Sequence, residues 1–255
     1  MGISHGAVLV TGASRGIGLA TVERIRSSCE QLILVGHTKA PAAPVSWTGS
    51  GAESYQVDLR DPGERLRFRE RLAARDGLPI TGFVHCAGGG MPAAVEDVDA
   101  QVLRDLFELH VVAFVELAQD LLPAMRNNEF GRIVAVGSLA PLRPRPFMVP
   151  YAATKAALRT AVQCLAAEVI GDSVLVNCVS PGGVDTDLGR AGRERLTELF
   201  ERQGRPAPPS RQGDLPRGRA VGAADVARAI AFLLDPENEV LAGQDVVVAG
   251  THVMR

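Results

Sequence analysis

Short apolar segments alternate along this chain with longer segments of helical periodicity. Seven apolar runs are predicted to be strands, at 7–11, 31–36, 54–57, 80–87, 131–138, 173–180 and 244–249. Most are apolar throughout, as in strands that are buried on both faces. The predicted helices lie between them, at 16–29, 61–75, 99–127, 151–170 and 222–235. This alternation predicts a single doubly wound (Rossmann-type) α/β domain over residues 1–255, with about seven parallel strands and helices on both faces.

Two segments interrupt the alternation. Residues 37–52 contain two prolines and two glycines where another helix might be expected, which predicts a loop crossing. Residues 187–220 form a long insertion that begins with helical periodicity over 188–203 and ends in Pro, Gly and Arg. An insertion of this kind between core elements often covers a binding site. We therefore expect 187–220 to be a substrate lid.

The composition narrows the class of partner. A net charge of -2 offers no broadly basic surface for nucleic acid or for an anionic membrane, so a small molecule is the expected partner. The first residues lack a secretion signal, and no apolar run reaches transmembrane length. Four cysteines without CxxC spacing indicate reduced, buried thiols rather than a metal or disulfide framework. Together these features predict a soluble, cytoplasmic protein with no metal site.

A glycine-rich turn, TGASRGIG at 11–18, follows the first predicted strand and opens the first predicted helix. Bare backbone and unpaired helix N–H groups make such a turn a site for a pyrophosphate. The alternative, a glycine turn with no ligand, is weakened by the position between strand and helix. The residues of this turn predicted to bind a dinucleotide are Gly12, Ser14, Arg15, Gly16, Ile17 and Gly18.

The end of the second predicted strand bears on the choice of dinucleotide. An acidic residue there usually binds the ribose hydroxyls of NAD. This chain instead has His37 and Thr38, and Arg15 in the glycine turn is available to a 2'-phosphate. NADP is therefore favoured over NAD, unless Arg15 and Lys39 are merely solvated surface charges. Asp58, after the third strand, is predicted to accept a bond from the adenine amino group, with a helix N-cap as the alternative.

Tyr151 and Lys155 carry the strongest chemical signal. The chain has only two tyrosines and two lysines, yet these two residues are four apart in a predicted helix and share one face. An ammonium near a phenol is expected to lower the phenol pKa and so to make Tyr151 a usable general acid or base. Ser138 ends the fifth predicted strand, 13 residues earlier, at the sheet edge where open α/β sheets bind ligands.

With these motifs the chain resembles the classical short-chain dehydrogenase/reductase family almost end to end. The matching segments are TGASRGIG at 11–18, Asp58, CAG at 86–88, Ser138, YAATK at 151–155, VNCVSPGGVDT at 176–186 and LAGQDVVVAG at 241–250. The resemblance implies that Tyr151 donates a proton to a carbonyl oxygen, that Lys155 tunes it and holds the nicotinamide ribose, and that Ser138 orients the carbonyl. It implies further cofactor contacts from Ala87, Gly88, Pro181, Gly182, Val184 and Thr186.

The chain departs from the family pattern at two histidine positions. His85 and Cys86 stand where the family commonly has two asparagines. His110 stands where the family usually places a catalytic asparagine, whose backbone carbonyl holds a water in a proton relay. Three readings of His110 remain open: a structural substitution that keeps the relay, an imidazole that exchanges protons itself, or impaired catalysis.

The resemblance implies an NADP(H)-dependent oxidoreductase that interconverts a ketone and a secondary alcohol. Two alternatives are an NADP-binding regulatory or scaffold protein with little catalysis, and an epimerase or dehydratase that uses the same pocket. The predicted lid is rich in arginine, and two more arginines, Arg143 and Arg145, lie between Ser138 and Tyr151. These arginines suggest an anionic or carrier-linked substrate. The alternative is that they belong to an arginine-rich, solvated surface. Apolar walls are expected from Met91, Leu139, Pro141, Phe147 and Met148.

The long apolar helices predicted at 99–127 and 151–170 favour self-association. In the family such helices pair across a two-fold axis, which implies a homotetramer or a dimer. The alternative is that their second apolar face simply covers the sheet.

Overall fold

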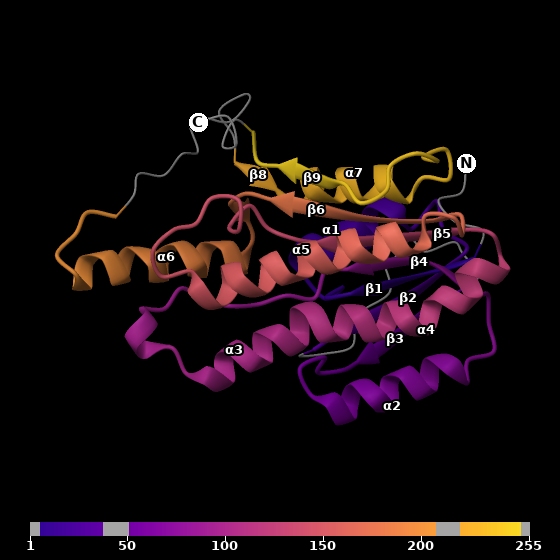
Figure 1. Ribbon diagram of the computed structural model, residues 1–255, viewed down its shortest axis with the longest axis horizontal. Helices are drawn as coiled ribbons and strands as arrows, with labels where there is room; N and C mark the ends of the chain where they lie inside the picture. The colour runs from indigo at the N-terminus through magenta and orange to yellow at the C-terminus, as the bar shows by residue number, and fades with distance from the viewer. Residues whose placement is uncertain (1–5, 38–50, 208–219, 251–255) are drawn as a thin grey trace.

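The fold is a seven-stranded parallel sheet between two layers of helices (Figure 1). The computed structural model describes residues 6–37, 51–207 and 220–250, so Thr38 lies outside the described residues. The strand order β3-β2-β1-β4-β5-β6-β9 confirms the predicted doubly wound architecture. All seven predicted strands are present, two with the predicted ends and five with ends displaced by one or two residues. They are β1 (Ala7–Thr11), β2 (Gln31–Gly36), β3 (Ala52–Gln56), β4 (Ile80–His85), β5 (Gly131–Val136), β6 (Val174–Pro181) and β9 (Asp245–Val248).

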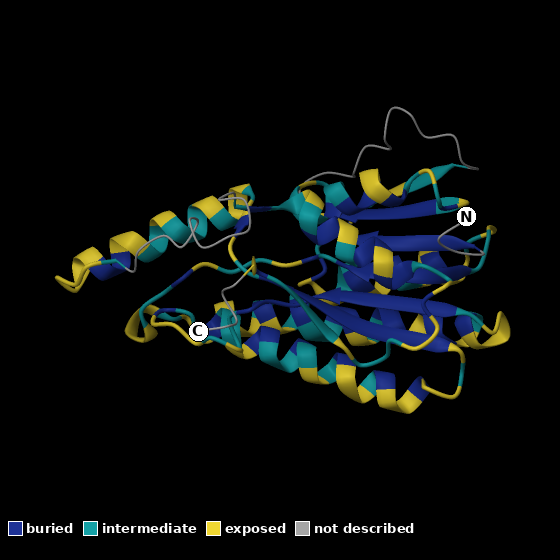
Figure 2. Cartoon of the chain, turned by 90° about the horizontal axis from the view of Figure 1, so that it is seen from above, coloured by how far each residue is buried: buried dark blue, intermediate teal, exposed yellow. Residues whose placement is uncertain are grey.

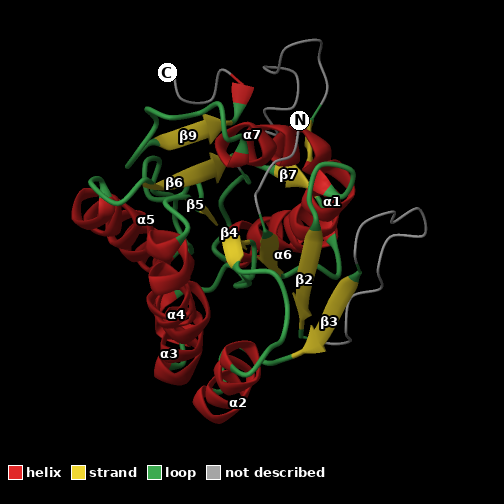
Figure 3. Cartoon of the chain, turned by 90° about the vertical axis from the view of Figure 1, so that its right-hand side faces the viewer, coloured by secondary structure: helices red, strands yellow, loops and turns green. Residues whose placement is uncertain are grey.

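Alternate side chains of each central strand enter two separate cores. In β1, Ala7 and Leu9 pack on one face of the sheet, whereas Val8 and Val10 pack on the other. The first core is covered by α2 (Pro62–Ala73), α4 (Ala113–Asn127) and α5 (Val149–Val169), and the second by α1 (Gly16–Ile25) and α7 (Ala223–Leu234). Figure 3 shows these two layers on opposite sides of the strands. Burial on both faces explains why the strands are apolar throughout.

The helix predicted at 99–127 is interrupted. It consists of α3 (Ala100–Phe107), a π-helical turn η2 (Glu108–Val112) and α4, and is preceded by a 3₁₀ turn η1 (Val95–Asp97). The segment has no glycine, and its one proline, Pro123, lies in α4 well beyond the π turn, so neither residue type marks the turn in the sequence. His110 lies within η2. Because π turns inside α-helices are frequent at functional sites, this position associates His110 with the candidate site.

The predicted insertion begins with a helix, as expected. Helix α6 (Asp187–Arg202) is capped by Thr186, whose hydroxyl accepts a hydrogen bond from the Gly189 N–H at 3.1 Å. A short parallel pair, β7 (Val184–Asp185) and β8 (Val221–Gly222), links the start and end of this region and was not predicted, because two-residue strands have no periodicity. Figure 2 shows α6 projecting from the body of the molecule with many exposed positions.

A small apolar cluster holds the far end of α6. Phe147 lies against Leu199 and Phe200, and the rings of Phe147 and Phe200 meet edge to face at 5.1 Å. Phe147 was expected to line the substrate pocket but is buried in this cluster instead. No described helix is both long enough and apolar enough to cross a membrane.

Candidate active site

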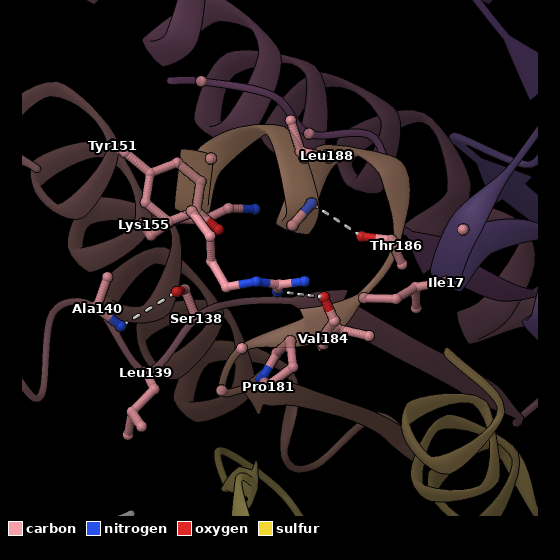
Figure 4. A pocket seen from close by; sticks show the side chains of 18 of the residues that line it. Ile17, Ser138, Leu139, Ala140, Tyr151, Lys155, Pro181, Val184, Thr186 and Leu188 are labelled. Carbon is pink, nitrogen blue, oxygen red and sulfur yellow. Dashed lines mark hydrogen bonds between the residues drawn. The ribbon is translucent and has the colours of Figure 1, made fainter. Parts of the chain in front are cut away.

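A cavity of about 730 Å³ opens at the carboxyl ends of the central strands. One wall is the glycine turn, and Ser138, Tyr151 and Lys155 line the opposite side (Figure 4). The strand order reverses between β1 and β4, and such a switch point is where open α/β sheets bind ligands. The predicted site residues that line this cavity are Gly12, Arg15, Gly16, Ile17, Gly18, Gly88, Ser138, Tyr151, Lys155, Pro181, Gly182, Val184 and Thr186.

Of the predicted site residues that the structure describes, five do not line the cavity. Ala87 and His110 are buried just behind its wall, and Ser14 belongs to the glycine turn. His37 and Asp58 lie together beyond the ends of β2 and β3, with His37 Nε2 3.3 Å from an Asp58 carboxylate oxygen. Of the five apolar residues expected to form walls, Leu139 and Met148 line the cavity.

The glycine turn has no room for side chains at two positions. Gly12 has φ +66°, and a Cβ there would lie 2.8 Å from the backbone of Cys86 and Ala87. A Cβ on Gly18 would overlap the carbonyl oxygen of Gly12. The N-cap residue of α1, Arg15, makes no side-chain hydrogen bond to the helix. The first N–H groups of α1 therefore face the cavity without a capping side chain, which suits a phosphate.

Tyr151 lies at the start of α5, beside Ser138. Burial raises the pKa of the Tyr151 phenol, and a hydrogen bond with Ser138 opposes this effect. The sequence predicted the opposite direction, from the nearby ammonium, and that prediction is wrong for the protein without ligands. The ring packs against the loop after β4, where a Cβ on Gly90 would lie 3.1 Å from it, and this loss of water outweighs the Ser138 hydrogen bond.

Lys155 follows one helical turn later and is almost completely buried. Its ammonium donates a hydrogen bond to the Val136 carbonyl at 2.8 Å, which fixes it at the end of β5. Desolvation lowers the pKa of Lys155 to about 8. A Cβ on Gly88 would lie 3.5 Å from this ammonium, so the glycine keeps the space beside Lys155 open.

His110 is held inside a complete hydrogen-bond network. The Gly89 N–H donates to Nε2 at 3.3 Å, and Nδ1 lies 2.9 Å from the Thr154 hydroxyl. Since Nε2 accepts, the proton of the neutral ring is on Nδ1 and points to Thr154. Burial and the Lys155 charge hold the pKa of His110 well below its usual range. This geometry favours the structural reading of His110.

His85 is likewise fully buried and paired. Its Nε2 lies 3.1 Å from the Leu109 carbonyl and its Nδ1 lies 3.0 Å from the Thr11 hydroxyl. Burial lowers the pKa of His85 to about 3, so the ring is neutral. His85 thus joins β1 and β4 to the π turn at Leu109, a packing role at a position where the family commonly has asparagine. No cluster of potential metal ligands occurs in the described part of the chain.

Several residues that contact the site were not predicted from the sequence. Arg60 binds the Asp58 carboxylate through Nε at 2.9 Å and a terminal nitrogen at 2.7 Å, and lies 3.2 Å from His37. The helix after β3 is capped by Asp61, so the alternative of Asp58 as N-cap is wrong. Thr154 and Gly89 were also missed, whereas Arg193, one of the lid arginines expected to attract an anionic substrate, does line the cavity. The position of Arg60 after a strand end was a usable signal.

Comparison with known proteins agrees with this geometry. The family model described as "short chain dehydrogenase" matches residues 6–197. The chain belongs to the short-chain dehydrogenase family. Among its curated relatives is the 3-oxoacyl-[acyl-carrier-protein] reductase FabG of Escherichia coli, which is 29% identical over 243 residues and 95% of each chain. The oxidoreductase YmfI of Bacillus subtilis is 30% identical over 252 residues, covering 95% of this chain and 96% of the relative.

Solved structures with bound cofactor are similar over nearly the whole chain. A 3-oxoacyl (acyl-carrier-protein) reductase from Agrobacterium tumefaciens with NADP bound has a TM-score of 0.80 and 28% identity, covering 98% of this chain and 95% of that one. The L-sorbose reductase of Gluconobacter frateurii, complexed with NADPH and L-sorbose, has a TM-score of 0.80 and 26% identity, covering 98% and 97%. These relatives establish that the chain is an oxidoreductase of this family.

Proposed function

We propose that this protein is an NADP(H)-dependent ketoreductase that interconverts a ketone and a secondary alcohol by hydride transfer. The observation that carries the proposal is the convergence of Ser138, Tyr151 and Lys155 on the wall of one cavity whose other wall is the glycine turn. A binding or scaffold protein would have no use for a phenol and an ammonium at this place. The proposal therefore depends on these residues bordering one cavity together, and no single residue would support it alone.

The chain's residues fit a dinucleotide. Gly12 and Gly18 leave the backbone bare where a pyrophosphate would approach, and the cavity is long enough to reach from Arg15 to Tyr151. Arg15, His37 and Arg60 supply positive charge or hydrogen-bond donors toward the 2'-phosphate that distinguishes NADP, in keeping with the NADP and NADPH bound to the two solved relatives. When bound, NADPH supplies the hydride, and the protein supplies position and protons.

In the direction of reduction, we assign the proton transfer to Tyr151. Its hydroxyl donates the proton to the carbonyl oxygen of the substrate, while the Ser138 hydroxyl holds that oxygen in place. The Lys155 ammonium stabilises the phenolate that remains. Because burial alone raises the pKa of Tyr151, the substrate complex needs this cation close to the phenol for proton return near neutral pH.

The substrate is proposed to be an anionic or carrier-linked ketone, such as the 3-oxoacyl groups named for several relatives. Arg143 and Arg145 line the cavity, and neither has an ion-pair partner in the described part of the chain. Guanidinium groups without an ion-pair partner attract anions and pair readily with phosphate or carboxylate. Leu139 and Met148 add apolar contacts to the same cavity.

The test is NADPH oxidation followed by absorbance with a panel of 3-oxoacyl thioesters and simple ketones. Tyr151→Phe removes only the hydroxyl and should lower kcat about 10²- to 10⁴-fold, the usual contribution of a general acid. NADPH binding should be nearly unchanged, because the ring still fills its place against Gly90. Equal turnover by both proteins would rule out the proposed mechanism.

We also propose that the protein works in the cytoplasm as a homodimer or homotetramer. Its four cysteines are free, which is compatible with a reducing compartment. Cys29 and Cys178 are buried as predicted, whereas Cys86 is partly buried and Cys164 is exposed, so the prediction of burial is wrong for Cys164. Val115 on α4 and Val149 on α5 are exposed on the outer helix layer, where a second copy would cover them. Sedimentation of the purified protein at several concentrations would test the assembly.

A further inference from the structure

Arg193, on α6, reaches back into the cavity. It lines the cavity wall, and one terminal nitrogen lies 3.4 Å from the Val184 carbonyl, a bond marked at Val184 in Figure 4. That distance is long for a hydrogen bond, so the contact is weak. Within the described residues, the only carboxylate within ion-pair distance is Asp185, at 3.9 Å. The Arg193 guanidinium therefore lies in the cavity wall without a close negative partner for its charge.

The other described arginines of α6 have closer partners. Arg190 takes the same Asp185 carboxylate at 2.6 Å and Asp187 at 2.5 Å. Arg195 pairs with Glu198 at 3.0 Å, and Arg202 pairs with Asp97 at 3.2 Å. Since Asp185 is already engaged by Arg190, little of its charge is left for Arg193. Arg193 is thus the cation of this helix that remains available to a ligand.

The guanidinium lies on the wall that faces the glycine turn. It contacts Val184, two residues before Thr186, and the Thr186 methyl group lies 3.5 Å from where a Cβ on Gly16 would be. The weakly compensated cation and the bare N-terminus of α1 therefore border the same part of the cavity. A phosphate in that space would accept backbone hydrogen bonds from one side and a guanidinium from the other.

We propose that Arg193 is a phosphate-binding residue carried by the lid helix. A phosphate accepts two parallel N–H bonds from a guanidinium, which is a better arrangement than the single long bond to Val184. Two phosphates are candidates, and both rest on the proposed function: the pyrophosphate of the dinucleotide, and the phosphate of a carrier arm on the substrate. Either would draw α6 toward the body of the molecule.

The experiment is direct titration of NADPH and NADH into the full-length protein, followed by fluorescence and independent of turnover. Arg193→Gln should weaken binding of both dinucleotides by about 10- to 100-fold if the pyrophosphate is the partner, since both share it. Arg193→Lys should recover part of the loss by restoring the charge. Arg195→Gln is the matched control, because it removes the same charge from the same helix outside the cavity, and should change binding less than about two-fold.

A second arm distinguishes the substrate phosphate. If Arg193→Gln binds NADPH normally but raises KM for a phosphopantetheine thioester by about tenfold, with KM for a phosphate-free ketone unchanged, the partner is the carrier arm. No change in either measurement would overturn the proposal. So would an equal effect of Arg195→Gln, or a loss restricted to NADPH, which would point to the 2'-phosphate instead. Dinucleotide titration needs no catalysis. The binding of NADPH and NADH can therefore be measured even if the protein lacks the proposed ketoreductase activity, so the two proposals are tested separately.

Discussion

At the scale of single residues, the structure predicts that His110 has a structural and not a catalytic role. Replacement by Asn should change kcat by no more than a few fold and should leave the pH dependence of kcat in place. The reason is that the buried ring is neutral and serves Gly89 and Thr154 as a hydrogen-bond partner. Replacement by Leu should lower the free energy of unfolding by about 1–3 kcal/mol, since both partners are left unsatisfied. Steady-state kinetics across pH and urea denaturation would measure these effects. A large rate loss with a shifted pH profile in the Asn variant would instead indicate a participating imidazole.

Lys155 predicts a pH dependence of stability in the protein without ligands. Folding lowers its pKa from 10.5 to about 8, so the unfolded chain binds more protons between pH 8 and 10.5. Lys155 therefore opposes folding by about 3 kcal/mol at pH 7, and this penalty disappears as pH rises through that window.

Lys155→Met should accordingly gain stability relative to wild type at pH 7 and lose this advantage above about pH 10. Thermal midpoints of both proteins from pH 7 to 10 would show it, and the comparison cancels the effects of the buried cysteines. A constant difference between the two proteins across that range would contradict the lowered pKa. Activity of the variant should be lost at every pH if the proposed role of Lys155 is correct.

The sequence was sufficient to place Ser138, Tyr151 and Lys155 together, because strand ends share one edge of a parallel sheet and i, i+4 residues share one helix face. The sequence was not sufficient to predict the direction of the Tyr151 pKa shift or the hydrogen bonds of His110. The raised pKa of Tyr151 depends on how deeply the phenol is enclosed, and the His110 network joins residues 44 positions apart. Both depend on tertiary packing that no local pattern records.

At the scale of elements, Arg65 holds α2 against the interrupted helix. Its buried guanidinium binds Glu108, at the start of the π turn, at 2.7 Å and Glu116, on α4, at 2.6 Å, and donates a third bond to the Leu59 carbonyl. The Arg65 side chain is 2% exposed, whereas the Glu108 and Glu116 side chains are 33% and 30% exposed. Arg65 thereby fixes both sides of the turn that contains His110.

Arg65→Met should lower the free energy of unfolding by about 2–3 kcal/mol, since it removes three hydrogen bonds of a buried cation while water can reach the two carboxylates left behind. The matched control is Arg69→Met on the same helix. Arg69 pairs with Asp120 in a more exposed place and should cost no more than about 1 kcal/mol. Urea denaturation would measure both. Similar losses in the two variants would mean that burial of the Arg65 network contributes little.

Element by element, the strands were the most predictable part of the fold. β1 and β2 were predicted to the residue because both are apolar throughout and end at turn-forming residues. β3, in contrast, has the mixed burial of an edge strand, and its start was misplaced by two residues. The π turn was not predictable, because no glycine or proline marks it and the side chains that bind it, such as Arg65 and His85, come from other elements.

At the scale of the whole molecule, α6 connects to the body mainly at its two ends. Thr186 caps the beginning, and the cluster of Phe147, Leu199 and Phe200 anchors the far end. Phe147 has φ +67°, an unusual conformation for a bulky residue, which the surrounding contacts must maintain. If residues 187–220 act as a lid, the position of α6 depends on this small cluster more than on any broad interface.

Phe200→Ala should therefore loosen α6 without unfolding the domain, since its cluster is separate from the two cores that cover the sheet. Limited digestion with trypsin should cut the variant several-fold faster than wild type after the arginines of α6, because local opening exposes the backbone there. NADPH should slow this cleavage if a bound phosphate draws in Arg193. Phe232→Ala, on the exposed face of α7, is the control and should be cut like wild type. Equal cleavage of Phe200→Ala and wild type would show that α6 is held by other contacts and that the aromatic pair does not set the position of the lid.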